Sequence, residues 1–531
     1  MATTDRSTPE GEAFRRDITR LAGSRRRFCR RVVAAALLAS CCGAGPALAQ
    51  RVSVDAGIAS NATWTSNSLI GLSTPQSDTV FDVRPHFTIR ADGARLKLSG
   101  TAALDAVTYA RGSLPSRLLP TADLTARLEA VQRLLYLETE LRATRTSENP
   151  FGARSETASG SNTLTTTQLR VSPYIDATAG PGLRYRVRSD NIRTSESGRT
   201  LSQDAPSASG YFGHHTASIE QDPRTIGWRL EIERSETRYN DSVQPAVIID
   251  LARASVNYAA SDDLSFGVRG GPERNSLLGD KRNHTIAGVQ MKWQPSERTL
   301  LTGFGERRFF GNSWHVAFDH RSPHIAWNML FARGIDTAPQ GLFELPATNN
   351  VAALLDAMFT TRIPDPVERA RKVQEFINLQ GLPGQTLQAT NIYSQRLSLA
   401  TTGNATVTWI GVRNSLALSA YYSRSQDAPD AGLLATGRPI NNNTQIGASV
   451  AFSHRLSAVS SLSVTVDASR IRALESIAVD QTKQAGVRAS VSTQLAPKTT
   501  LVFGAGYSKL GSNVTVGGQQ SALFVGMDHG F

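Results

Sequence analysis

Histidine and acidic side chains are the first places to look for chemistry in this sequence. The candidates are His214, His215, His315, Asp319, His320 and His324. Adjacent residues on a strand point to opposite faces, so His214 and His215 are not expected to bind one metal ion together. Apolar residues alternate with His315 and Asp319 and leave both on a polar face. Structural hydrogen bonding is the expected role there, because no serine is marked as a nucleophile beside them.

Other signatures of catalysis or cofactor binding are missing from the sequence. It has no glycine-rich phosphate loop, no HExxH metalloprotease motif and no calcium-binding loop. The cysteines Cys29, Cys41 and Cys42 all precede residue 50, so the expected mature chain has no disulfide and no thiolate metal site. We therefore expect neither an enzyme nor a cofactor.

Charged side chains recur instead at every second position of long alternating segments. In residues 226–234, for example, apolar Trp228 and Leu230 alternate with Arg229 and Glu231. This two-residue period is that of a β-strand with one apolar and one polar face. In a closed barrel the polar face turns inward. The candidate lumen charges are Arg84, Arg90, Glu138, Glu140, Arg184, Arg186, Arg188, Arg229, Glu231 and Glu233.

The length of these segments favours a transmembrane barrel over a soluble sheet. A soluble strand averages about 5–6 residues, whereas a tilted membrane-spanning strand needs about 9–11. Short connections, such as 92–93 and 496–498, alternate with long ones, such as 147–159 and 427–442. Outer-membrane barrels alternate periplasmic turns and extracellular loops in this way. The expected fold is all-β, a transmembrane antiparallel up-and-down barrel of about 22 strands, with a range of about 18–24.

The last strand indicates where such a barrel closes. Leu523, Val525, Met527 and Phe531 fall on one face of a segment that ends on an aromatic ring. It resembles the closing strand of bacterial outer-membrane barrels, which the barrel-assembly machinery recognises. The alternative is an ordinary edge strand at the end of the chain.

The first 49 residues read as an export signal. A basic block at 24–31 is followed by a short apolar stretch, and Ala47 and Ala49 frame a cleavage site before Gln50. The basic block also resembles a twin-arginine motif, which we discount because that route carries folded proteins. Cys41 ends a lipoprotein-like box, so lipidation at Cys41 is the alternative to cleavage after Ala49.

The expected organisation is therefore a signal peptide at 1–49 and a single barrel domain at 50–531, located in the bacterial outer membrane among its lipids. The signal contains nine Arg against four acidic residues and leaves +7 of the formal +12 charge to the mature chain. A charge this small gives no reason to expect nucleic acid as a partner. TonB-dependent receptors resemble one another in having a large N-terminal plug domain. The strand-like alternation of apolar and polar residues starts near residue 50 and leaves no room for a plug domain, so this class of receptor is not expected.

Residues 338–385 break the strand pattern and predict two helices. Residues 351–359 form a short apolar helix, and Asp365 with Pro366 forms the capped start of a second. The parity of the connections places this helical insertion in an extracellular loop. It is either a solvated lid or a plug folded into the lumen.

Several motifs in the second half of the chain resemble a known group of proteins. They are GERRFFGNSWHV (305–316), FDHR (318–321), TRIPDP (361–366), GLP (381–383), YSQRLSL (393–399) and NSLALSAYY (414–422). Together they resemble the uncharacterised outer-membrane barrels of PEP-CTERM/exosortase loci, which commonly also encode exopolysaccharide synthesis and export. The family has no established catalytic residues, so the resemblance implies only a barrel and polysaccharide-export components as partners.

We expect a pore or accessory protein for export or anchoring of exopolysaccharide or another hydrophilic solute. Arginine-rich strands would favour an anionic solute if their charges face water. The alternatives are a non-conducting structural or adhesion scaffold, in which the inward charges pair and fill the lumen, and a secreted all-β binding module.

The terminal strand gives the first testable prediction. Deleting Phe531, or replacing it with Asp, should reduce the heat-modifiable, membrane-inserted form and leave export to the periplasm intact, because the assembly machinery would lose its aromatic anchor. Cell fractionation followed by unheated gel electrophoresis measures both quantities. Normal insertion of the truncated chain would show that the terminal strand has no such role.

Overall fold

The computed structural model describes residues 51–531, except 73–74, 148, 154–161, 181, 198–208, 222–224, 241–245, 277–281, 337–350, 361, 365, 381–397, 428–441 and 475–479. The expected signal peptide, its cleavage site (Ala47, Ala49, Gln50) and the alternative lipidation site at Cys41 lie outside these residues, as does the cap at Asp365.

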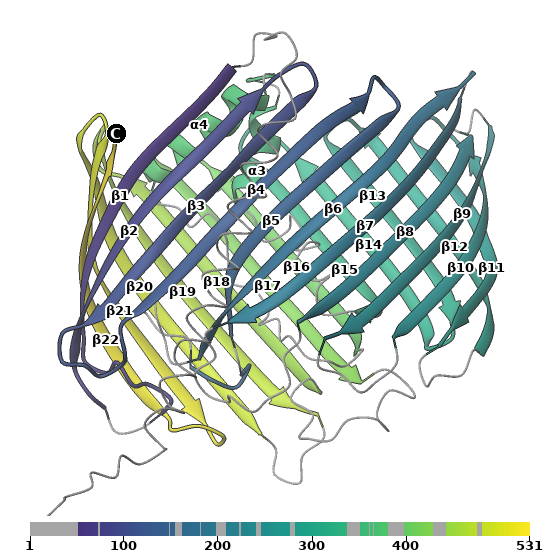
Figure 1. The fold of residues 1–531 in the computed structure, drawn as a ribbon. Coiled ribbons are helices and arrows are strands. Elements are labelled where there is room, and N and C mark those ends of the chain that lie inside the picture. The colour runs from purple at the N-terminus through teal and green to yellow at the C-terminus, as the bar shows by residue number, and fades with distance from the viewer. Residues whose placement is uncertain are drawn as a thin grey trace, which may run out of the picture. The chain divides into compact units, whose positions relative to one another are not determined.

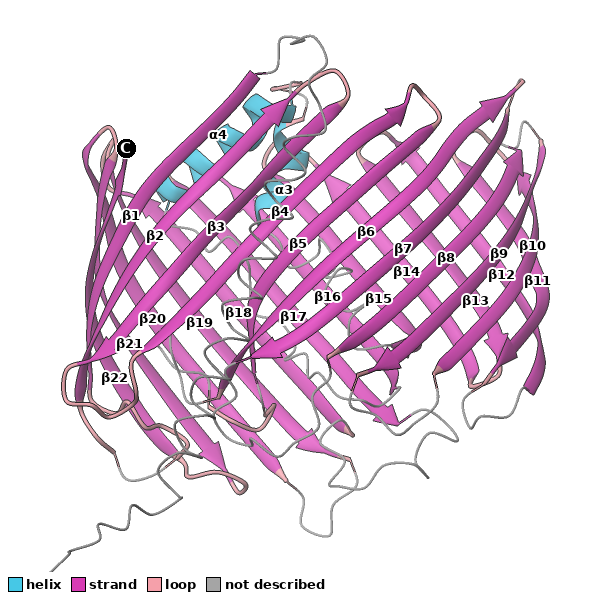
Figure 2. Cartoon of the chain, in the orientation of Figure 1, coloured by secondary structure: helices cyan, strands magenta, loops and turns pink. Residues whose placement is uncertain are grey.

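Twenty-two antiparallel strands form one closed sheet (Figures 1 and 2). In chain order they are β1 (Arg51–Thr65), β2 (Asp78–Asp92), β3 (Leu96–Tyr109), β4 (Arg117–Val131), β5 (Leu135–Ser147), β6 (Thr163–Ala179), β7 (Leu183–Ser197), β8 (Gly210–Gln221), β9 (Ile226–Tyr239), β10 (Val247–Ala259), β11 (Leu264–Asn275), β12 (Arg282–Ser296), β13 (Thr299–Arg308), β14 (Gly311–Arg321), β15 (Ile325–Asp336), β16 (Ser398–Ile410), β17 (Asn414–Asp427), β18 (Asn443–Arg455), β19 (Ser460–Ala473), β20 (Gln481–Ala496), β21 (Thr499–Ser512) and β22 (Gly518–Gly530). Each strand pairs with its neighbours in the chain, and β1 pairs with β22 from Gly57–Gly530 to Thr65–Ala522, which closes the barrel. The predicted up-and-down barrel of 22 strands is confirmed.

The two rims of the barrel differ in their connections. Each even-numbered strand from β2 to β20 is followed by the next strand after only two to four residues, such as 93–95 or 497–498, and we call this rim the turn end. The opposite rim, the loop end, carries most of the long connections, although Phe309 and Phe310 alone join β13 to β14 there. Both β1 and β22 have their free ends at the turn end, which is uppermost in Figure 1.

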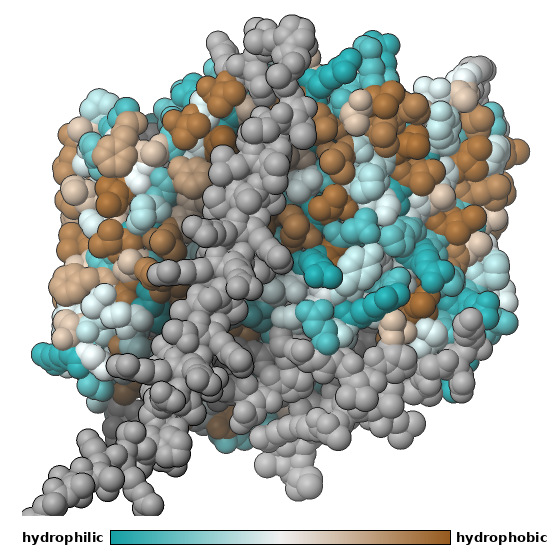
Figure 3. All heavy atoms as spheres, in the orientation of Figure 1, coloured by the Kyte–Doolittle hydropathy of each residue, from teal (hydrophilic) through white to brown (hydrophobic). Residues whose placement is uncertain are grey.

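Apolar side chains cover the outside of the barrel. Leu118, Ile232 and Val268 are each more than 60% exposed, and similar residues alternate along nearly every strand. Hydrophobic side chains occupy much of the face seen in Figure 3. Soluble proteins rarely expose a contiguous apolar patch beyond roughly a few hundred Å², so this surface requires an apolar solvent. None of the described helices is long and apolar enough to cross a membrane.

The inside of the barrel has two contrasting sectors. The inward positions of β2–β14 carry many Arg, Glu and Asp side chains, and we call this sector the charged wall. The inward positions of β15–β22 carry mostly Ser, Thr, Asn, Gln, Gly and Ala, and we call this sector the small-residue wall. Ala326, Ala417 and Ala451 on this wall are at most 3% exposed, so another element covers them.

That element is the helical insertion between β15 and β16. Its helices are α3 (Val351–Phe359) and α4 (Pro366–Gln380), drawn in cyan in Figure 2. Leu355 and Met358 of α3 and Val373 and Ile377 of α4 form one buried cluster with the alanines of the small-residue wall. Small wall residues let a helix approach the sheet closely, so this sector is the one that can accept the insertion.

The insertion lies at the opposite end of the barrel from its connections. It leaves β15 and enters β16 at the loop end, as the parity argument predicted. The helices, however, pack near the turn end, where the Arg321 guanidinium donates a hydrogen bond to the Ala357 carbonyl over 3.2 Å. Of the two placements considered, a solvated extracellular lid is therefore wrong for the described helices, which lie in the lumen because their apolar faces need a dry partner surface.

Removing a buried contact should release this insertion. Replacing fully buried Leu355 with Ala should weaken docking by about 2–3 kcal/mol, because the side chain leaves a cavity in the cluster. Trypsin should then cleave the refolded protein faster at α4, and the barrel fragments should stay heat-modifiable. Glu375→Ala, on the exposed face of α4, serves as the control. Equal cleavage rates for the two variants would contradict docking.

Candidate functional site

The candidate functional site is the charged wall of the lumen. All ten lumen charges expected from the sequence lie at inward positions, because their strand neighbours Phe87, Val187 and Leu230 point outward and are exposed. Register brings them close across strands: Arg184 faces Glu220, and Glu231 faces Arg253. The structure therefore gathers residues that are far apart in the sequence.

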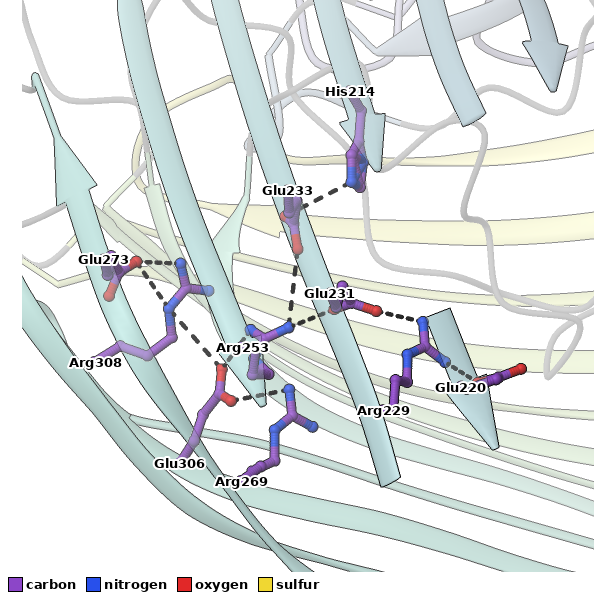
Figure 4. A network of polar contacts seen from close by, with 10 residues as sticks. All are labelled: His214, Glu220, Arg229, Glu231, Glu233, Arg253, Arg269, Glu273, Glu306 and Arg308. Carbon is purple, nitrogen blue, oxygen red and sulfur yellow. Dashed lines mark hydrogen bonds and ion pairs between the residues drawn. The ribbon is translucent and has the colours of Figure 1, made fainter. Parts of the chain in front are cut away.

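One network of ten residues spans β8 to β13 (Figure 4). Arg253 is its centre, with one guanidinium nitrogen 2.8 Å from Glu231 and another 3.1 Å from Glu306. Glu306 also lies 2.9 Å from Arg269, and Glu231 contacts Arg229. The remaining members are His214, Glu220, Glu233, Glu273 and Arg308.

A second group of ion pairs covers β4 to β7. Glu140 accepts from Arg170 and lies 3.0 Å from Arg142. The Arg188 guanidinium is 2.8 Å from Glu138 and 2.9 Å from Asp190. Arg84 on β2 pairs with buried Asp105 over 3.2 Å. The charged wall is thus a connected surface of paired charges.

The pairing leaves little net charge on this wall. The network of Figure 4 contains four arginines and five glutamates. Arg184 and Arg186 both contact Asp176, at 2.7 and 2.5 Å. Both arginine side chains remain nearly half exposed. The general anion preference suggested by arginine-rich strands is therefore weakened by this pairing.

A polar cavity lies beside the network at the turn end. Its volume is about 770 Å³. The charged and amide side chains that line it are Arg229, Arg269, Lys292, Asp262, Asp263, Asn257, Gln290 and Gln294. The Phe304 and His315 rings stack in parallel at its edge, 5.6 Å apart. Guanidinium, carboxylate, amide and aromatic groups together can hold a polyhydroxylated molecule.

The loop end carries a second inward-folded segment that the sequence did not reveal. The backbone carbonyl of Phe151, in the β5–β6 connection, accepts a hydrogen bond from the Thr482 hydroxyl on β20 at 3.0 Å. Asn162 braces this segment through two 2.8 Å hydrogen bonds with the Asn149 backbone. A contact between residues 331 positions apart has no local sequence signal.

The histidines take structural places, each with its own partner. His214 faces Glu233 in the lumen at 3.6 Å, whereas His215 contacts the Ser189 hydroxyl at 2.8 Å on the outer face. His320 contacts Thr299, and His324 lies 3.1 Å from the Ile410 carbonyl. Within the described residues no group of three or more potential ligands could hold a metal ion.

The terminal strand presents its apolar face to the outside. Leu523, Val525 and Met527 are 46–58% exposed, and the Phe531 amide donates to the Ala56 carbonyl at 2.8 Å. The strand is thus the seam at which the barrel closes on β1. Its recognition by the assembly machinery stays a prediction.

Comparisons with known proteins give only distant likenesses. A scan of protein-family models and a search of curated proteins both found no match. Similar solved structures include the siderophore receptor PirA from Acinetobacter baumannii, at 8% identity, 91% coverage of this chain, 81% of that chain and a TM-score of 0.41. A mutant of the ferric enterobactin receptor PfeA from Pseudomonas aeruginosa, in complex with enterobactin, is 10% identical, with 89% of this chain and 81% of that chain covered and a TM-score of 0.43. The FrpB iron transporter from Neisseria meningitidis is 8% identical, with 90% of this chain and 82% of that chain covered and a TM-score of 0.46. Likenesses this distant do not carry a function over. The closed barrel and its apolar exterior are nonetheless those of an outer-membrane barrel.

The ion-pair network should matter for stability. Replacing Glu306 with Gln leaves Arg253 and Arg269 without their shared carboxylate, and we expect a loss of about 3 kcal/mol in the free energy of unfolding. Equilibrium urea unfolding in lipid vesicles measures this loss. Glu220→Gln, at the more exposed edge of the network, should cost less than about 1 kcal/mol. Equal losses would show that Glu306 has no special place in the network.

Proposed function

We propose that this protein is an outer-membrane conduit for a hydrophilic solute, held closed by its helical insertion. The proposal places the turn end in the periplasm and the loop end outside the cell, as in other outer-membrane barrels. It includes a cleaved signal peptide ending at Ala49 and assembly by the barrel-assembly machinery. It includes no catalytic step and no bound cofactor.

The observation that carries the proposal is that polar groups face the lumen both from α4 and from the charged wall. The apolar faces of α3 and α4 pack against the small-residue wall. Arg371 and Glu375, on the other face of α4, are more than half exposed. The opposite sector offers ion pairs and the polar cavity. A passage bounded by hydrophilic groups on both sides holds water and suits a hydrophilic solute.

The solute class follows from the chemistry of the cavity. Side chains of both charges and amide groups beside a stacked aromatic pair favour a polyhydroxylated chain. The resemblance to barrels of PEP-CTERM/exosortase loci supports an exopolysaccharide as this solute and polysaccharide-export components as partners. Nothing in the charged wall favours nucleic acid.

A second candidate function is a non-conducting scaffold that anchors or displays surface material. The pairing of the lumen charges favours it, because paired charges across strands can brace a barrel as well as line a channel. The loop-end contact between Phe151 and Thr482 is also consistent with a permanently closed mouth. Conductance separates the two functions.

Planar-bilayer recording of the refolded protein is the decisive test. Deleting residues 338–385 should raise single-channel conductance several-fold, because the described helices leave the lumen. The joint change of Arg184 and Arg186 to Gln should lower anion preference, since it removes two nearly half-exposed positive charges from the lumen. Arg234→Gln is the matched control, because Arg234 pairs with Asp250 on the outer face. A barrel that stays silent with and without the insertion would overturn the conduit and support the scaffold.

A further inference from the structure

The lipid-facing surface of β16–β21 contains a furrow that the conduit does not use. One alanine from each of five successive strands lies in a single cross-strand row, at outward positions: Ala405, Ala420, Ala448, Ala468 and Ala485. The adjacent row toward the turn end consists of larger residues, among them Leu418, Val450 and Val466. A row of methyl groups beside branched side chains forms a trough in the barrel surface.

Large side chains also border the trough on the side nearer the loop end, along β15 to β18. Phe331, Tyr422 and Ile446 belong to the row nearer the loop end and are 39–53% exposed. The resulting groove has a volume of about 880 Å³, within the range of about 300–1,000 Å³ typical of ligand sites. With strands about 4.8 Å apart, five alanines make a floor roughly 20 Å long, which suits an extended acyl chain.

The groove ends on a cluster of cations. The alanine row continues from Ala485 to Lys509 on β21, and the neighbouring row continues from Ile446 to Arg470 and Lys483. Lys509 lies three residues from the loop end of β21, whereas Ala405 lies seven from that of β16. The groove therefore rises from the middle of the membrane toward the outer interface.

Among the residues that the structure describes, no ion pair joins these three cations to an acidic side chain. Arg470 and Lys483 stand directly opposite one another, an arrangement that destabilises a sheet unless an anion compensates it. The Arg470 guanidinium donates a hydrogen bond to the neutral side chain of Gln481, at 2.7 Å. The outward strand positions of β16–β22 include no Asp or Glu. Elsewhere on the outer face the pattern differs, because Arg234 pairs with Asp250.

We propose that this groove binds a phosphorylated glycolipid of the outer leaflet. An acyl chain would lie along the alanine row, and a phosphate group would contact Arg470, Lys483 and Lys509. Cations within a lipid-facing surface are costly near the bilayer centre and much less so at the interface, where a headgroup phosphate can meet them. The inference rests on the proposed placement of the loop end outside the cell. It does not require the barrel to conduct.

Native mass spectrometry of the full barrel, refolded in lipid-free detergent, tests the proposal. Three lipids are added separately: bisphosphorylated lipid A, the same lipid without its phosphates, and phosphatidylglycerol. Lipid A should bind, and removing its phosphates should weaken binding by about 100-fold, given about 1 kcal/mol for each cation at a membrane surface. Phosphatidylglycerol binding as tight as that of lipid A would overturn the assignment to a glycolipid.

Two variants and two matched controls locate the site. Joint replacement of Arg470, Lys483 and Lys509 by Gln should weaken lipid A binding as strongly as dephosphorylation does. Ala468→Trp should weaken it by filling the groove without a change of charge. The controls are Arg234→Gln and Ala254→Trp, both on the outer face away from the groove.

Heat-modifiable migration confirms that each variant has folded. Unchanged lipid A binding in either groove variant, or equal loss in either control, would overturn the site. Conductance is recorded on the same samples, so failure of the conduit and failure of the lipid site give different results.

Discussion

Backbone hydrogen bonding in a medium without water is the constraint on which this structure depends. Every strand crossing the membrane must pair on both sides, and only a closed sheet can achieve that without a helix. Closure through β1 and β22 then sorts every side chain by parity into an outward or an inward position. The apolar exterior and the charged interior are both consequences of one period of two residues.

The inner surface divides further, and the division decides where the insertion sits. A wall of large, ion-paired side chains cannot accept a helix closely, because desolvating arginines and carboxylates costs more than the contact returns. A wall of alanine, serine and glycine presents little bulk and few charges. The apolar stripes of α3 and α4 find their dry partner there, with Val351 and Leu355 fully buried.

The sequence predicted the features that follow from local periodicity, and missed those that depend on distant contacts. Strand number, turn positions and the inward set from Arg84 to Glu233 follow from periodicity, and α3 was predicted with its exact limits. The lumenal position of the helices was left open, because nothing in residues 351–380 specifies which surface covers their apolar face. The pairing of Arg253 with Glu306 and the contact of Phe151 with Thr482 depend on register and on chain segments far apart. Such contacts could be identified only once the strands were placed in the closed barrel.

The position of the helical insertion in the chain constrains when its helices can dock during folding of the barrel. The helices leave from β15, yet α4 packs against strands β18, β19 and β20, which follow it in the chain. Its docking surface does not exist until the last quarter of the barrel is paired. Docking of α4 therefore cannot be complete before β18, β19 and β20 have paired, which makes closure of the lumen a late event in assembly.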